Sequence, residues 1–157
     1  MINIDYIEVV KAKDISTPGF LFSGVNNLGN CITGTIKDES EFPAAVHLSG
    51  SLQDKRYTFS ALRPIREDKV VSFVRSKLVF EVDGSSVRSV EHRGVSCDDA
   101  GSLIKNSCGI FIVSFRGHNV YLLKIQGNSF PSLNEEVFVF DKWRLLIGDE
   151  SQEVFKK

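Results

Sequence analysis

The chain has 157 residues, the size of one ordinary domain, and its hydrophobic and charged fractions of 42% and 25% are those of a globular protein. These values exclude a wholly disordered chain. The formal net charge of −1 argues against binding to nucleic acid or anionic lipid through overall charge. The charge is nevertheless uneven, because residues 1–54 carry a net −4 and residues 55–93 a net +4.

The cysteine pattern indicates a reducing compartment. The chain has three cysteines and no CxxC pair, whereas a secreted disulfide framework has an even, denser set. The N-terminus lacks the basic start and apolar core of a signal peptide. The most apolar run, Ile110–Phe115, is far shorter than the roughly 20 residues that span a bilayer. We expect a cytoplasmic protein without membrane association.

Alternating apolar residues predict strands through the first half of the chain. A solvated turn over 37–41 separates two of these strands, and Gly34 is interpreted as a bulge. The segment 67–75 fits either a strand or a short helix capped by its acidic pair, and we favour the helix. The predicted strands and short apolar runs are Ile2–Tyr6, Phe20–Phe22, Cys31–Ile36, Ala44–Leu48 and Tyr57–Leu62.

Two hairpins are predicted in the second half. The first joins 78–82 to 87–90 through Gly84 and Ser85, and places Val82 opposite Val87. The second joins 110–116 to 119–126 through Gly117 and His118. It is apolar on both faces, as expected for a central hairpin covered above and below. The cross-strand pairs predicted for it are Phe115–Val120, Val113–Leu122, Ile112–Leu123 and Ile110–Ile125.

The remaining elements are one helix and one long strand. A short helix is expected over 98–106, with an aspartate as its N-cap. Residues 137–147 are expected to form a single strand, bent near Asp141 and Lys142, and a charged tail begins at about 149. We therefore expect a single β-rich domain over 1–157, an antiparallel β-sandwich or partly closed β-barrel with one or two short helices.

Cys97 is the first candidate for chemistry. It precedes the helix predicted over 98–106, a position that activates thiols, and His92 lies five residues before it. The adjoining Asp98 and Asp99 disfavour a thiolate, however. We interpret Cys97 as a small apolar residue, and a Cys-dependent enzyme remains an alternative.

The other motifs are weaker. The three histidines have no metal-ligand spacing. The carboxylate pairs 98–99 and 135–136 are able to act in acid–base catalysis, but they stand at predicted element starts and are interpreted as a cap and a solvated turn. The glycines form no phosphate-binding loop, and no GxSxG elbow is present. We expect no catalytic residue, metal or cofactor.

Absence of catalytic motifs favours a binding role. We expect a non-enzymatic protein-binding module, such as an inhibitor or toxin-neutralising immunity protein, whose partner recognises charge around an aromatic anchor. The alternative is a small-ligand carrier, because twelve phenylalanines are enough to line a cavity. Nucleic acid is disfavoured by the net charge. The expected interface residues are Asp38, Glu39, Glu41, Arg63 and Arg66.

Overall fold

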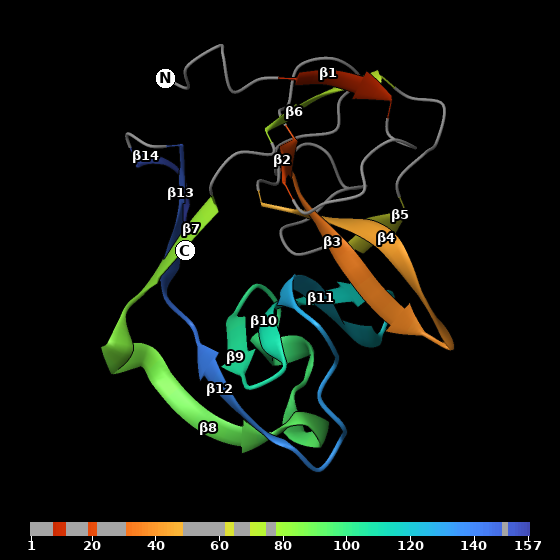
Figure 1. The fold of residues 1–157 in the computed structure, drawn as a ribbon. Coiled ribbons are helices and arrows are strands. Elements are labelled where there is room, and N and C mark those ends of the chain that lie inside the picture. Colours follow the sequence, from red (N-terminus) through yellow and green to blue (C-terminus); the bar gives the residue numbers. More distant parts are fainter. Residues whose placement is uncertain are drawn as a thin grey trace.

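The computed structural model describes residues 8–11, 19–21, 31–48, 62–64, 70–74, 78–148 and 151–157. Within these ranges the chain consists of β-strands and three short 3₁₀ turns, over Gly84–Ser86, His92–Gly94 and Cys97–Asp99, with no α-helix among the described residues. The strands form two antiparallel sheets (Figure 1).

The larger sheet has the order β1-β6-β2-β3-β11-β10-β9-β12-β8, with β4 paired to β3 and β5 paired to β4. The smaller sheet has the order β14-β13-β7. The bounds of the strands in the larger sheet are β1 Glu8–Lys11, β2 Phe20–Leu21, β3 Cys31–Asp38, β4 Ser40–His47, β5 Leu62–Pro64, β6 Val70–Val74, β8 Val87–Glu91, β9 Leu103–Asn106, β10 Gly109–Arg116, β11 Asn119–Gly127 and β12 Glu136–Phe140. Those of the smaller sheet are β7 Leu78–Val82, β13 Trp143–Ile147 and β14 Gln152–Lys156.

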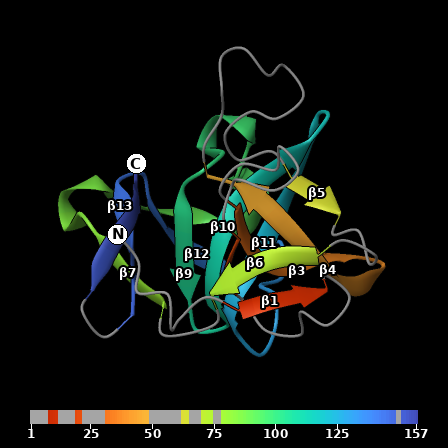
Figure 2. The same ribbon diagram turned by 90° about the horizontal axis from the view of Figure 1, so that it is seen from above.

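The smaller sheet packs against one face of the larger sheet, which confirms the antiparallel sandwich. In Figure 2, β7 and β13 lie to one side of β9 and β10, and β3 and β4 lie to the other. Within the described residues the two ends of the larger sheet, β1 and β8, do not pair, so this sheet does not close on itself.

The β10–β11 hairpin is central, as predicted. Its strands pair Ile112 with Leu123 and Val113 with Leu122, in the expected register. A bulge between Ile110 and Phe111 shifts the far end, so that Ile110 pairs with Gln126 rather than with Ile125. This pairing is the one error in the predicted register, and its cause is the extra residue that the bulge inserts.

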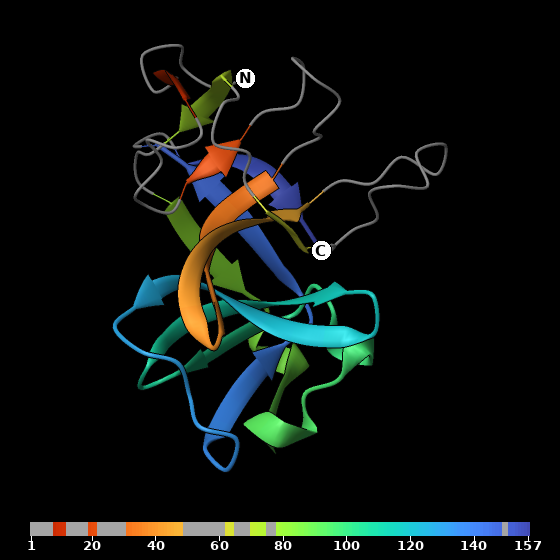
Figure 3. The same ribbon diagram turned by 90° about the vertical axis from the view of Figure 1, so that its right-hand side faces the viewer.

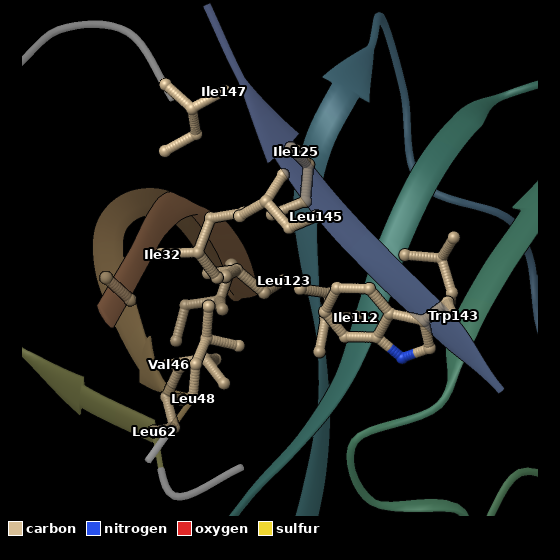
Figure 4. Close-up of a cluster of buried hydrophobic side chains, with 13 residues drawn as sticks. Ile32, Val46, Leu48, Leu62, Ile112, Leu123, Ile125, Trp143, Leu145 and Ile147 are labelled. Atoms are coloured by element: carbon tan, nitrogen blue, oxygen red, sulfur yellow. The ribbon is translucent and has the colours of Figure 1, made fainter. Parts of the chain in front are cut away.

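The two faces of this hairpin belong to different cores. On one face, which we call the sheet-covered face, Ile112 and Leu123 pack against Trp143 and Leu145 of β13 (Figure 4). On the other face, which we call the loop-covered face, Phe111, Val113 and Leu122 pack with Ile104, Val137 and Val139. The cover there comes from the 92–102 and 128–135 segments, through side chains such as Val95 and Phe130.

The predicted hairpin over 78–90 is wrong. β7 pairs with β13 in the smaller sheet, whereas β8 pairs with β12 in the larger sheet. Residues 83–86 form a corner rather than a hairpin turn, held by Asp83 N–H, which donates to Lys142 O at 2.9 Å. Val82 and Val87 are therefore not opposed, and both are about 40% exposed.

The strand predicted over 137–147 is interrupted at the expected bend. β12 ends at Phe140 and β13 begins at Trp143, so the chain passes from the larger to the smaller sheet at Asp141 and Lys142. The two crossings run side by side, because Phe140 pairs with Val87 and Trp143 pairs with Val82. The segment expected as a charged tail contributes β14.

Both predicted helices are wrong within the described residues. In 98–106 only a 3₁₀ turn forms, capped by Ser96 and Asp99, and Leu103–Asn106 is β9. In 67–75, Val70–Val74 is the strand β6, the alternative that the sequence left open. In each case an apolar run pairs as a strand with a neighbouring strand that is distant in sequence. This pairing outweighs the local preference for a helix. The strand predicted over Ile2–Tyr6 lies outside the described residues, as does most of Tyr57–Leu62.

Candidate functional site

The three acidic residues of the predicted interface lie together on the turn between β3 and β4, which we call the acidic turn. Asp38, Glu39 and Glu41 are all exposed. Lys37 pairs with Glu41 and Asp38 with Ser40, so the chain reverses around Glu39 alone. Glu39 has φ 63, a left-handed conformation that non-glycine residues rarely adopt. The strongly curved hairpin that carries this turn is drawn in orange in Figure 3.

Of the two basic residues of the predicted interface, the structure places the backbone of Arg63. Arg63 lies on β5 opposite Ala45, four residues along β4 from Glu41. At roughly 3.3 Å per residue this places the backbone of Arg63 about 13 Å from that of Glu41 along the strand. Arg66 lies outside the described residues. The grouping of all five residues in one interface therefore stays a prediction.

A surface groove of about 410 Å³ lies on the loop-covered face, beside the acidic turn. Apolar groups of β11 and of the 128–135 segment meet polar and charged groups in its wall. We call it the Phe130 groove. Its lining residues are Lys37, His92, Val120, Tyr121, Leu122, Phe130, Pro131, Ser132, Leu133 and Glu135.

Phe130 anchors the 128–135 segment over β10 and β11. Its ring lies 5.7 Å from that of Phe111, tilted by 44°. Lys124 Nζ lies 4.8 Å from the Phe130 ring centroid and 3.7 Å from Glu41 Oε2. The largely buried Lys124 side chain therefore makes both a cation–π contact with the groove and an ion pair with the acidic turn. Through it, Glu41 is joined to the groove.

Glu135 holds the end of the same segment. Its Oε1 accepts hydrogen bonds from Ser132 N–H at 3.2 Å and from Ser132 Oγ at 3.0 Å. Its Oε2 accepts from Asn106 Nδ2 at 3.4 Å and from Cys108 Sγ at 3.5 Å. These donors, with the Ser132 N–H first among them, lower the pKa of the Glu135 carboxyl. Glu135 is therefore ionised at neutral pH.

His92 contributes an acceptor to the groove. Its Nδ1 lies 3.0 Å from Pro131 O, and a carbonyl oxygen only accepts, so Nδ1 carries the proton. In the neutral ring Nε2 is then unprotonated. No described residue engages Nε2, which leaves it able to accept a hydrogen bond from a bound molecule.

A second groove, of about 580 Å³, lies at the end of the smaller sheet. Three of its charged side chains, Glu81, Asp83 and Arg144, are engaged by the fold itself. Arg144 contacts Glu81 at 2.5 Å and Glu153 at 3.4 Å, and the hydrogen bond that it donates to Glu81 raises the pKa of its guanidinium. Asp83 accepts from Ser85, which lowers the pKa of its carboxyl. The ion pairs fasten β13 to β7 and β14, and Lys142, Lys156 and Lys157 also line the groove.

A partly buried polar network joins the corner to the loop-covered face. Arg88 pairs with Asp99, which is 7% exposed, and lies 3.5 Å from Asp141. Ser102 Oγ donates to Asp141 at 2.8 Å, and this bond lowers the pKa of the Asp141 carboxyl. Lys157 Nζ lies 3.3 Å from Ser102 Oγ, and burial lowers the pKa of its ammonium. The arrangement is structural, because its groups bond to one another.

Cys97 does not stand at a helix N-terminus, because the helix predicted after it is absent. It is exposed, and its Sγ lies 3.6 Å from His118 O. The cysteine–histidine pair that the structure does form is Cys31 Sγ with His47 Nδ1, at 3.4 Å. Both side chains are almost wholly buried, so no substrate reaches them from outside. The sequence contains a signal for the Cys31–His47 pair, because a hairpin that turns at Glu39 places Cys31 opposite His47.

The two carboxylate pairs serve as expected of structural groups. Asp99 completes a capping box with Ser96, and Glu135 holds its own turn. Among the described residues, no three His, Cys, Asp or Glu side chains are grouped so as to hold a metal ion. The described part of the chain also contains no helix long and apolar enough to cross a membrane.

Comparison with known proteins gives no relative. No family model matches the chain, and neither a curated protein nor a solved structure matches it. The site must therefore be interpreted from its own geometry.

Proposed function

We propose that the chain is a non-enzymatic protein-binding module, of the kind that inhibits or neutralises a partner protein, and that the partner engages the Phe130 groove and the acidic turn. The groove carries this proposal. Its apolar floor of Val120, Leu122 and Phe130 lies within a rim of charged and polar side chains. That is the anatomy of a protein interface, an apolar centre inside a polar rim.

An exposed side chain at the rim supports the same role. Leu133 is 62% exposed although it is large and apolar, and it stands beside the groove on a segment fixed at both ends. Arg93 N–H donates to Leu133 O at 2.9 Å, and Glu135 is held by four donors. A rigid apolar anchor loses little conformational freedom on binding.

Catalysis is less well supported by the same groups. The groove contains a carboxylate, a thiol nearby and an imidazole. The carboxylate, however, accepts its hydrogen bonds from the turn that contains it, and Cys108 Sγ donates to Glu135 rather than to a histidine. A cysteine nucleophile requires the opposite arrangement, a base that removes its proton.

A crosslinking experiment tests the proposal. A photoreactive amino acid is placed at Leu133 and, as a control, at exposed Glu153 on the smaller sheet, and each variant is co-expressed with the product of the adjacent gene. We expect a covalent heterodimer from position 133 and none from position 153. Two separate gel-filtration peaks with no crosslink from position 133 would overturn the proposal.

The small-ligand carrier remains a second candidate because of the groove volume, which lies within the roughly 300–1,000 Å³ typical of ligand sites. A carrier is expected to have a cavity lined by several phenylalanines, whereas among the phenylalanines that the structure describes only Phe130 lines this groove. Native mass spectrometry of the purified protein distinguishes the two, because a carrier retains an adduct of a few hundred daltons.

A further inference from the structure

We infer that the partner presents to the Phe130 groove a basic segment with one large apolar side chain. The apolar side chain would sit against Val120, Leu122 and Phe130, and its basic neighbours would face the acidic turn and Glu135. The inference rests on the proposed function and specifies the chemistry of the partner.

The apolar part follows from the floor of the groove. Leu122 is 6% exposed and belongs to the buried cluster of the loop-covered face, and Val120 and Phe130 pack on that cluster. The floor is therefore an extension of the core that reaches the surface. An apolar side chain placed there continues the core packing, as anchor residues do at the centre of an interface.

The basic part follows from the charges around the floor. Two ion pairs are complete, Lys124 with Glu41 and Arg93 with Glu91. Among the described lining residues this leaves the cation Lys37 and the carboxylate Glu135, and the acidic turn that follows Lys37 adds the exposed carboxylates Asp38 and Glu39. The local excess is negative, and Asp38 and Glu39 belong to residues 1–54, which carry a net −4. A basic segment complements it.

Two groups inside the groove favour a basic segment. Glu135 is ionised, and its negative charge attracts a cation, although its oxygens already accept four hydrogen bonds from Ser132, Asn106 and Cys108. His92 Nδ1 donates to Pro131 O, so in the neutral ring Nε2 accepts a hydrogen bond. Arginine and lysine side chains are donors only. Lys37 acts in the opposite direction, because its ammonium repels a basic segment, so its removal should strengthen binding.

The test uses defined peptides and the full chain. The probe is an N-acetylated, C-amidated pentapeptide with phenylalanine at its centre and two basic residues on each side. Its controls are the same peptide with acidic flanks and the basic peptide with a central serine. Each is titrated to millimolar concentration into isotope-labelled protein, and amide chemical shifts are followed. We expect only the basic phenylalanine peptide to shift the amide signals of Val120–Leu122, Phe130 and Ser132–Glu135.

Matched variants establish the charge effect. Glu39→Gln should weaken binding of the basic peptide about two- to fivefold, which is the usual contribution of an exposed ion pair. Glu153→Gln, the same substitution on the smaller sheet, should leave it unchanged. Lys37→Gln should tighten it by a similar factor, and added salt should reduce all of these differences.

The failures of the two proposals are distinguishable. If the acidic peptide binds as well as the basic one, or if the groove amides do not shift, the inference of a basic partner segment is overturned. This holds even where the Leu133 crosslink forms. If the chain self-associates through the groove, the basic segment is overturned as well. If the basic peptide binds and no heterodimer forms, the preference of the groove for a basic segment is supported and the proposed function is overturned.

Discussion

The two faces of the β10–β11 hairpin are covered in different ways. On the sheet-covered face, β13 lies over the hairpin, and Ile112, Leu123, Trp143 and Leu145 are all less than 3% exposed. On the loop-covered face, the 92–102 and 128–135 segments provide the cover, and the Phe130 groove reaches the core beside them. A sheet packs side chains in regular rows, whereas a loop touches the core only at its few inward residues. The accessible site is on the face that no sheet covers.

The sharpest test of this difference compares two adjacent leucines of β11. Leu123→Ala should destabilise the protein by about 4 kcal/mol, because it leaves a closed cavity under the smaller sheet. Leu122→Ala should cost about 2 kcal/mol, because the groove next to it lets the surroundings and water adjust. Urea denaturation of both variants measures the contrast, and equal losses would contradict a difference between the faces.

Gly34 tests how the acidic turn is joined to the groove. A Cβ at this position would lie 2.4 Å from Lys124 O, which is backbone and unable to move aside. Gly34 therefore permits close approach of β3 and β11, and it is not the bulge expected from sequence, since β3 pairs with β4 without interruption there. Gly34→Ala should cost about 2–3 kcal/mol.

Gly84→Ala is the matched control for that substitution. A Cβ at Gly84 meets nothing within 4 Å, so the change should be neutral or stabilise the fold by about 0.5 kcal/mol. Thermal unfolding of both variants provides the measurement. If both alanines behave alike, the contact with Lys124 is not what requires glycine at position 34.

Asp99 tests the fastening of the 92–102 segment. Asp99→Asn keeps the acceptor for Ser96 N–H but removes the charge that pairs with Arg88. The cost should be about 1 kcal/mol, at the low end for a buried charged hydrogen bond, because Arg88 is 40% exposed and can be hydrated. Hydrogen exchange should show faster exchange in 92–102 than in β13, and a uniform increase would contradict a local role.

Substitution of Glu135 should have the smallest effect on stability, and this effect should depend on pH. Its folded-state pKa lies below the ordinary value of 4.5, so the ionised carboxylate stabilises the fold above about pH 4.5. This stabilisation is lost as the pH falls through the folded-state pKa. Glu135→Gln should therefore reduce stability at pH 6 and show a weaker loss between pH 4.5 and pH 3 than the wild type. Parallel pH profiles for the two proteins would exclude the carboxylate as the source.

The predicted site shows where sequence reasoning succeeded and where it stopped. The acidic turn was identified because charged residues between two apolar strands mark a solvated reversal. The groove beside it was missed, because Lys37, His92, Val120 and Phe130 come from four separate segments and carry no common motif. Arg63 was added to the set on charge alone, and the register of β5 separates it from the turn.

The sequence by itself determined the β class, the solvated turn over 37–41, most of the register of β10–β11, and the bend at Asp141–Lys142. Each of these depends on the alternation of side chains and on turn residues within a short stretch of chain. Only the tertiary structure decided that β7 and β8 part into different sheets, that 98–106 is not a helix, and that one face of the central hairpin is left to loops. These features depend on partners distant in sequence, and local periodicity shows which side of a strand is apolar but not what covers it.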